Sequence, residues 1–90
     1  MPRNQPKPLR PEEYQQTLRD MRTLAGAFND DVEVTVTYEK RNGRMSSSHG
    51  KVEDFVGKAG FDTFSVQIID LSKTPPIRTI NMVGIKSIEF

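Results

Sequence analysis

Residues 32–39 read VEVTVTYE, a strict alternation of apolar and polar side chains. Successive side chains of a β-strand point to opposite faces, so this period of two predicts a strand with one buried and one exposed face. The alternation returns in residues 50–56 and again through Phe64, Val66 and Ile68. The chain is therefore expected to build a sheet.

Turn signals divide this region into strands. Asn42 and Gly43 both accept a positive φ, which suits a tight hairpin. Further turns are expected at residues 57–60 and in the proline-containing segment 72–76, and Gly50 is expected to mark a bulge or a sharp bend. The five expected strands cover residues 31–40, 44–56, 61–71, 77–81 and 85–90.

One amphipathic helix is expected before the strands, over residues 11–28. Pro11 suits a first helical turn, and Glu12 and Glu13 complement the free amides there. Apolar residues then recur at spacings of four and three, which lines them up on one face. This stripe, which must dock on the sheet, consists of Tyr14, Leu18, Met21, Ala25 and Phe28.

Ninety residues leave room for a single domain with a thin core. Residues 1–10 are proline-rich and nearly devoid of apolar side chains, so we expect a flexible basic arm carrying Arg3, Lys7 and Arg10. Residues 11–90 form the helix-plus-sheet domain. Five short strands leave two edges unless the sheet curls, which favours an α+β, mainly β fold: a helix capping a small, strongly bent, five-stranded antiparallel barrel.

Several functional classes are disfavoured by composition. The chain has no cysteine and no apolar run near the roughly 18 residues of a membrane span, so a cytoplasmic protein is expected. His49 is the only histidine, and its neighbour Ser48 would point to the opposite face of a strand, so no catalytic pair is expected. No carboxylate pair has the spacing of a metal site. We therefore expect no enzyme, no metal and no cofactor.

The order of these elements resembles the Sm-like fold, to which Hfq belongs, with glycines in the first hairpin and the second strand. Residues 32–90 are also similar to the YolD-like family, whose members read V-x-I-x-Y, a glycine turn, G-x-I and a final D-I-x-x-I-E. The matching segments here are residues 34–38, 42–43, 50–52, 64–66 and 84–89. The resemblance implies a small Sm-like or SH3-like barrel, no catalytic residue, and a link to DNA-damage tolerance or phage biology.

Two kinds of partner remain open. Unsatisfied strand edges favour binding to a protein partner or to a second copy of this chain. The expected edge is the last strand, with Ile85, Ser87, Ile88 and Phe90. The alternative is a nucleic-acid-binding protein in the manner of Hfq, which would contact backbone phosphates through the helix and the first hairpin. Its candidate residues are Arg19, Arg22, Lys40, Arg41 and Arg44.

Overall fold

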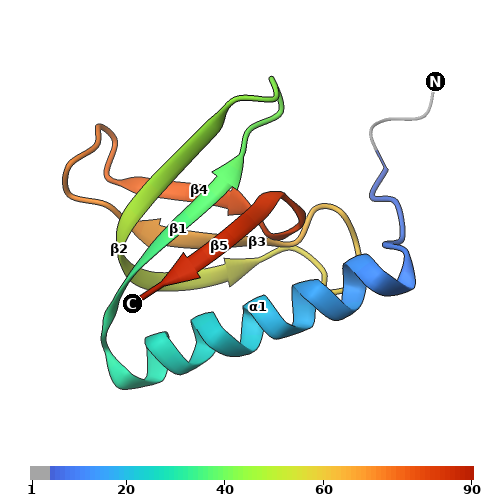
Figure 1. The fold of residues 1–90 in the computed structure, drawn as a ribbon, viewed down its shortest axis with the longest axis horizontal. Coiled ribbons are helices and arrows are strands. Elements are labelled where there is room, and N and C mark those ends of the chain that lie inside the picture. Colours follow the sequence, from blue (N-terminus) through green and yellow to red (C-terminus); the bar gives the residue numbers. More distant parts are fainter. Residues whose placement is uncertain (1–4) are drawn as a thin grey trace.

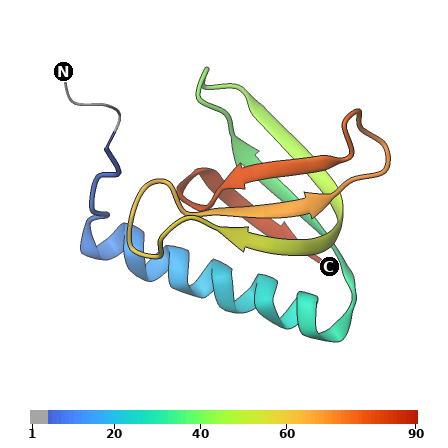
Figure 2. The same cartoon turned by 180° about the vertical axis from the view of Figure 1, so that it is seen from behind.

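The computed structural model describes residues 5–90 and places one helix before a five-stranded antiparallel sheet (Figure 1). The fold is α+β and mainly β, as the sequence predicts. The helix lies along one side of the bent sheet, and Figure 2 shows this arrangement from behind. In chain order the elements are α1 (Pro11–Asp30), β1 (Glu33–Glu39), β2 (Met45–Val56), β3 (Ser65–Ile69), β4 (Ile77–Asn81), the 3-10 turn η1 (Met82–Gly84) and β5 (Ile85–Glu89).

The helix α1 begins at Pro11, where the sequence places its start, and ends at Asp30 rather than Phe28. The backbone amide of Arg10 donates a 3.2 Å hydrogen bond to the Glu13 carboxylate, which stabilises the first turn. At the other end Asp31 takes a left-handed conformation with φ of 57°. This reversal ends α1 and directs the chain into β1.

The face that α1 buries differs from the predicted stripe. Its fully buried residues are Thr17, Leu24 and Ala27, while Tyr14 and Phe28 are 38% and 52% exposed. The helix packs mainly against β2 and η1, and these contacts set its rotation about its axis. Spacing of apolar residues alone does not fix that rotation, and Leu24, which flanks the predicted stripe, is fully buried.

The strand order in the sheet is β4-β3-β2-β1-β5, and all four pairings are antiparallel. The 12-residue β2 takes part in both halves of the sheet. Residues 45–51 pair with β1, whereas residues 51–56 pair with β3, and Figure 1 shows β2 curving strongly between the two halves. The register shifts between Val52 and Asp54, just after the predicted bend at Gly50.

The sheet does not close into the barrel that the sequence suggested. Within residues 5–90, β4 and β5 are the two outer strands and do not pair with each other. Both are only five residues long, and η1 leads the chain from β4 directly to the far side of β1. The result is a bent, open sheet. Its core is one cluster of buried side chains, Leu24, Ala27, Val34, Val36, Val52, Phe64, Val66, Ile68, Ile80, Met82 and Ile85.

The described part of the amino-terminal arm, residues 5–10, lies beside the loop before β3, and its expected flexibility stays a prediction. Residues 1–4, which include Arg3, lie outside the described residues. Residues 7–10 are held by the loop before β3: the amide of Leu9 donates to the Gly60 carbonyl at 3.0 Å, and the amide of Asp62 donates to the Lys7 carbonyl at 3.1 Å. Pro8 also forms an isolated bridge with Phe61. Backbone pairing replaces the apolar burial that this segment lacks, and it uses loop residues that the sequence assigned to the third strand.

No helix within residues 5–90 combines the length and the apolar character needed to cross a membrane.

Candidate binding groove

The basic residues proposed for nucleic-acid binding do not share one surface. Arg19 and Arg22 are exposed on α1, and a guanidinium nitrogen of Arg19 donates to the Gln16 side chain at 3.1 Å. The other three cations lie in the β1–β2 hairpin, residues 40–44. Figure 1 places this hairpin at the opposite end of the molecule from α1. The helix and hairpin therefore form two separate basic regions.

The hairpin itself is ordered by its backbone. The amide of Lys40 donates to the Arg44 carbonyl at 2.8 Å, and the amide of Gly43, whose φ is 82°, donates to the Lys40 carbonyl at 2.9 Å. The Asn42 side chain accepts from the Arg44 amide at 3.0 Å. Among the described residues, no carboxylate pairs with Lys40, Arg41 or Arg44. All three side chains are exposed, so their charges are available to a ligand.

The predicted partner-binding edge, β5, is an outer strand, but its side chains differ in how far they are exposed. β5 pairs with β1 along one edge, and its other edge has no strand beside it in the described part of the chain. Ser87 is exposed and Phe90 is 76% exposed, whereas Ile88 is half-buried. Ile85 is only 8% exposed, because its side chain belongs to the core. The side chain of Ile85 therefore faces the core, and its contact with a partner stays a prediction.

A feature that the sequence did not indicate lies on the open side of the sheet, between the strands that fail to close it. This groove, called here the edge groove, has a volume of about 1410 Å³. Every residue of β4 borders it, and the end of β1, the hairpin, η1 and β5 contribute the opposite side. The amino-terminal residues 5–8 also border it. Its charged side chains are Lys7, Glu39, Lys40, Arg41, Asp62, Arg78 and Lys86.

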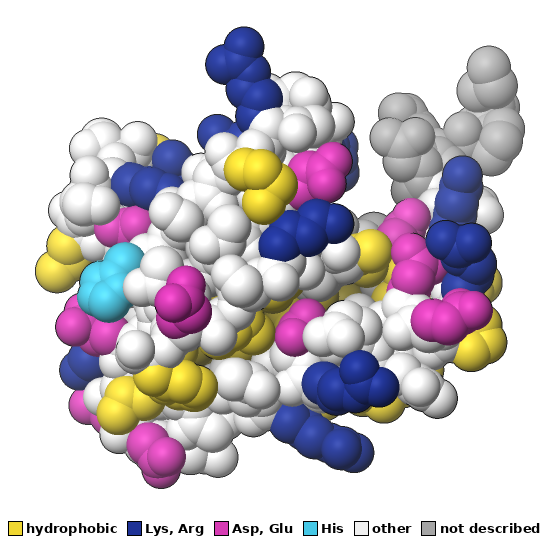
Figure 3. Space-filling view, in the orientation of Figure 1, with side chains coloured by type: hydrophobic (Ala, Val, Ile, Leu, Met, Phe, Trp, Pro, Cys, Tyr) yellow, Lys and Arg dark blue, Asp and Glu magenta, His cyan; other side chains and the backbone are white. Residues whose placement is uncertain are grey.

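Positive charge predominates in the edge groove, where five cations face two carboxylates. Both carboxylates are already engaged. Glu39 pairs with Lys86 at 3.5 Å, and Asp62 accepts a hydrogen bond from the Lys7 backbone amide at 3.0 Å. Within the described residues, the side chains of Arg78 and Arg41 have no carboxylate partner. In Figure 3, Lys and Arg side chains stand at the top of the molecule and others are scattered over the rest of the face.

Tyr38 borders the edge groove, and the pKa of its hydroxyl is shifted by its surroundings. Burial alone would raise the pKa of Tyr38. The hydroxyls of Ser48 and Ser46 and the positive charges of Lys73 and Lys40 outweigh burial, so that its pKa lies below the usual value. The two serine hydroxyls are the larger causes, and Lys73 is not among the residues that border the edge groove.

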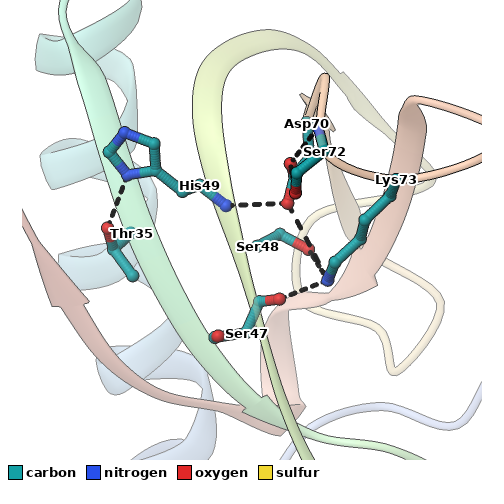
Figure 4. Close-up of polar contacts among 7 residues, drawn as sticks. All are labelled: Thr35, Ser47, Ser48, His49, Asp70, Ser72 and Lys73. Atoms are coloured by element: carbon teal, nitrogen blue, oxygen red, sulfur yellow. Dashed lines mark hydrogen bonds and ion pairs between the residues drawn. The ribbon is translucent and has the colours of Figure 1, made fainter.

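A second polar cluster, drawn in Figure 4, joins β2 to the β3–β4 loop. Asp70, 3% exposed, accepts hydrogen bonds from the Ser72 hydroxyl at 2.6 Å and from the His49 amide at 3.0 Å. These two bonds, chiefly the one from Ser72, lower the pKa of Asp70 to about 2. Lys73 lies 3.8 Å from the same carboxylate and donates to the Ser48 hydroxyl at 3.0 Å and to the Ser47 carbonyl. The cluster ties the loop to β2.

The geometry of this cluster does not assemble a nucleophile with a base. Ser48 is buried and contacts Lys73, while the neighbouring His49 is exposed on the other face and bonds Thr35 at 2.7 Å. The His49 ring therefore does not reach the Ser48 hydroxyl. The Lys73 ammonium already meets three oxygen atoms, from Ser47, Ser48 and Asp70. Across residues 5–90, no group of three or more potential metal ligands gathers in one place.

Comparison with known proteins gives no match: no family model, no curated protein and no solved structure is similar enough to place this chain in a family. The Sm-like and YolD-like resemblance therefore stays a prediction from the residues.

Proposed function

We propose that this protein is a non-enzymatic interaction module that binds a protein partner, or a second copy of itself, through an unpaired edge of its sheet. The observation that carries the proposal is the open side of the sheet. There β4 and β5 both end the strand order, and the edge groove lies between them. An edge strand presents N–H and C=O groups that an added strand can pair, which is a common mode of peptide recognition.

Two further observations support this function. Two exposed apolar side chains lie at the outer strands: Ile77, 49% exposed, begins β4, and Phe90, 76% exposed, directly follows β5. They offer apolar contacts beside the unpaired backbone. The polar cluster around Asp70 stabilises the loop and offers no reactive pair, because its hydrogen-bond donors and acceptors are bonded to one another.

The test is amide hydrogen exchange, residue by residue, at low and at high protein concentration. Amides on the free edges of β4 and β5 exchange rapidly in the isolated protein, because no strand covers them. If the protein pairs with itself, these amides gain protection as concentration rises, while exposed amides of the 57–60 turn do not. A partner that uses the edge produces the same protection at low protein concentration. Binding that protects only α1 would contradict the proposal.

A second function, nucleic-acid binding, is favoured by the hairpin cations that lack carboxylate partners. Contacts with phosphates release counterions, so affinity for a labelled oligonucleotide should fall steeply as salt rises. Because the hairpin and α1 are separate, Arg44→Gln should lower the slope of log affinity against log salt by about 1, and Arg22→Gln should leave it unchanged. Equal effects of the two variants, or an affinity independent of salt, would count against a phosphate site at the hairpin.

A further inference from the structure

We propose that the edge groove takes an extended acidic polypeptide segment, which pairs its backbone with β4 and sets its carboxylates against Arg78 on one side and Lys40 and Arg41 on the other. This inference rests on the proposed function and specifies both the edge and the partner.

The first step concerns which edge is used. All five residues of β4 border the edge groove, whereas β5 contributes only Lys86. At about 3.3 Å per residue, the β4 edge offers about 17 Å of backbone, enough for an added strand of about five residues. β4 pairs with β3 along its whole length on one side without a register shift, so its other edge belongs to a fully paired strand. The structure therefore favours β4 over β5, the strand that the sequence suggested.

The second step concerns the charge of the occupant. The side chains of Arg78, Lys40 and Arg41 have no carboxylate partner within the described residues, while Glu39 and Asp62 are engaged by Lys86 and by a backbone amide. The groove therefore carries an unbalanced positive charge that an acidic ligand would neutralise. Bringing carboxylates close to these cations gains little in open solvent, but strand pairing would hold them in place.

The third step concerns the pattern of the occupant. Successive side chains of an added strand alternate between the two faces of the sheet, so acidic residues at every second position would meet the same wall. The remaining positions lie over the other face of β4, where Ile77 is half-exposed, because Arg78 and the buried Ile80 share one face of the strand. An alternation of acidic and β-branched residues satisfies both requirements.

A single-stranded nucleic acid suits this groove less well. Sequence-tolerant binding of single strands uses aromatic side chains on which bases stack, and Tyr38 is the one aromatic residue among those bordering the groove in the described chain. A nucleic acid also has no backbone amide pattern that matches a strand edge. The unpaired edge of β4 would then stay unsatisfied, whereas a peptide satisfies the edge and the cations together.

The experiment is fluorescence anisotropy with a labelled peptide of alternating glutamate and valine, in full-length protein at low salt. Matched probes replace glutamate by glutamine or by lysine. Two further probes carry N-methyl groups, one on the odd-numbered amides of the peptide and the other on the even-numbered amides. Only one of these two sets of amides can face β4. An oligothymidine of equal charge serves as competitor.

We expect the glutamate peptide to bind, the glutamine peptide to bind about tenfold more weakly, and the lysine peptide not to bind. One N-methylated probe should lose binding and the other should keep it. The double variant Arg41→Gln, Arg78→Gln should weaken binding of the glutamate peptide about tenfold, while Arg22→Gln on α1 should not change it. Circular dichroism of each variant checks that the fold is intact.

The other outcomes separate the two proposals. If the glutamine peptide binds as well as the glutamate peptide, the edge function stands and the acidic specificity falls. If neither methylated probe loses binding, or if oligothymidine displaces the peptide at lower concentration, the groove does not work by strand addition to β4. If no peptide binds but self-association protects β5 amides alone, the inference about β4 falls and the edge function stands. If neither peptide binding nor self-association occurs, both proposals fall.

Discussion

Replacing Gly50 by alanine tests the close approach of β2 and β3 on which the bent sheet depends. A Cβ at Gly50 would lie 1.8 Å from the Ile69 carbonyl oxygen and 2.8 Å from its carbonyl carbon. Ordinary contact begins at 3.4 Å, so the backbone would have to move by the difference, 1.6 Å. The obstacle is backbone within a paired strand, which cannot rotate away as a flexible side chain could.

The cost can be estimated from the contacts that this movement breaks. Forcing extra atoms into a packed site costs about 1–3 kcal/mol. The movement also separates the Lys51–Ile69 pair and strains the 3.0 Å bond from the His49 amide to Asp70, each worth about 1 kcal/mol. We therefore expect Gly50→Ala to lower the free energy of unfolding by about 3 kcal/mol or more. For a domain of this size that lowers Tm by about 12–24 °C.

The assay is urea and thermal unfolding followed by circular dichroism, with Gly26→Ala as the matched control. Gly26 lies inside α1, and a Cβ there meets nothing within 4 Å. The control should raise stability by about 0.5–1 kcal/mol, because alanine favours the helix. A Gly50→Ala protein within about 1 kcal/mol of the parent would refute the reasoning and with it the tight bend of β2.

Three further changes have defined outcomes. Leu24→Ala should cost about 3 kcal/mol in urea unfolding, because the side chain is fully buried, and a cost under about 1 kcal/mol would contradict the docking of α1. Gly43→Val should destabilise by about 1 kcal/mol and Gly43→Asn by less, because the φ of 82° strains a β-branched residue most; equal costs would argue against this turn. Ionised Asp70 has a pKa of about 2 in the folded protein against an ordinary 3.8, so it stabilises above pH about 4 and this contribution is lost as pH falls toward 2. The difference in unfolding free energy between the parent and Asp70→Asn should shrink over that window, and a difference independent of pH would refute the assignment.

The parts of the fold that the sequence predicts are those with local physical causes. Alternation in β1 reflects one buried face, the Asn42-Gly43 pair suits a turn with positive φ at Gly43, and Pro11 suits a helix start. The rotation of α1 was not predictable, because it depends on contacts with β2 and η1. The failure of β4 and β5 to pair depends on the path of the chain through η1, and no local pattern expresses that path.

The candidate site was less predictable than the fold. The exposed hairpin cations follow from sequence, but the edge groove is assembled from segments near residues 7, 40, 62, 78 and 86, which no spacing connects. The role of Asp70 had a local signal that was missed: an aspartate two residues before Ser72 can accept that residue's amide, as it does here at 3.0 Å. The hydrogen bond that Asp70 accepts from the His49 amide, 21 residues away, had no local signal in the sequence.

The pairing of β5 with β1 joins strands that are far apart in the chain. Long-range pairing of this kind slows folding, because a large loop must be ordered before the contact forms. During synthesis one edge of β1 has no partner strand until residues 85–89 have been made. The nascent chain therefore exposes that edge to unwanted association from the synthesis of Glu39 to that of residues 85–89.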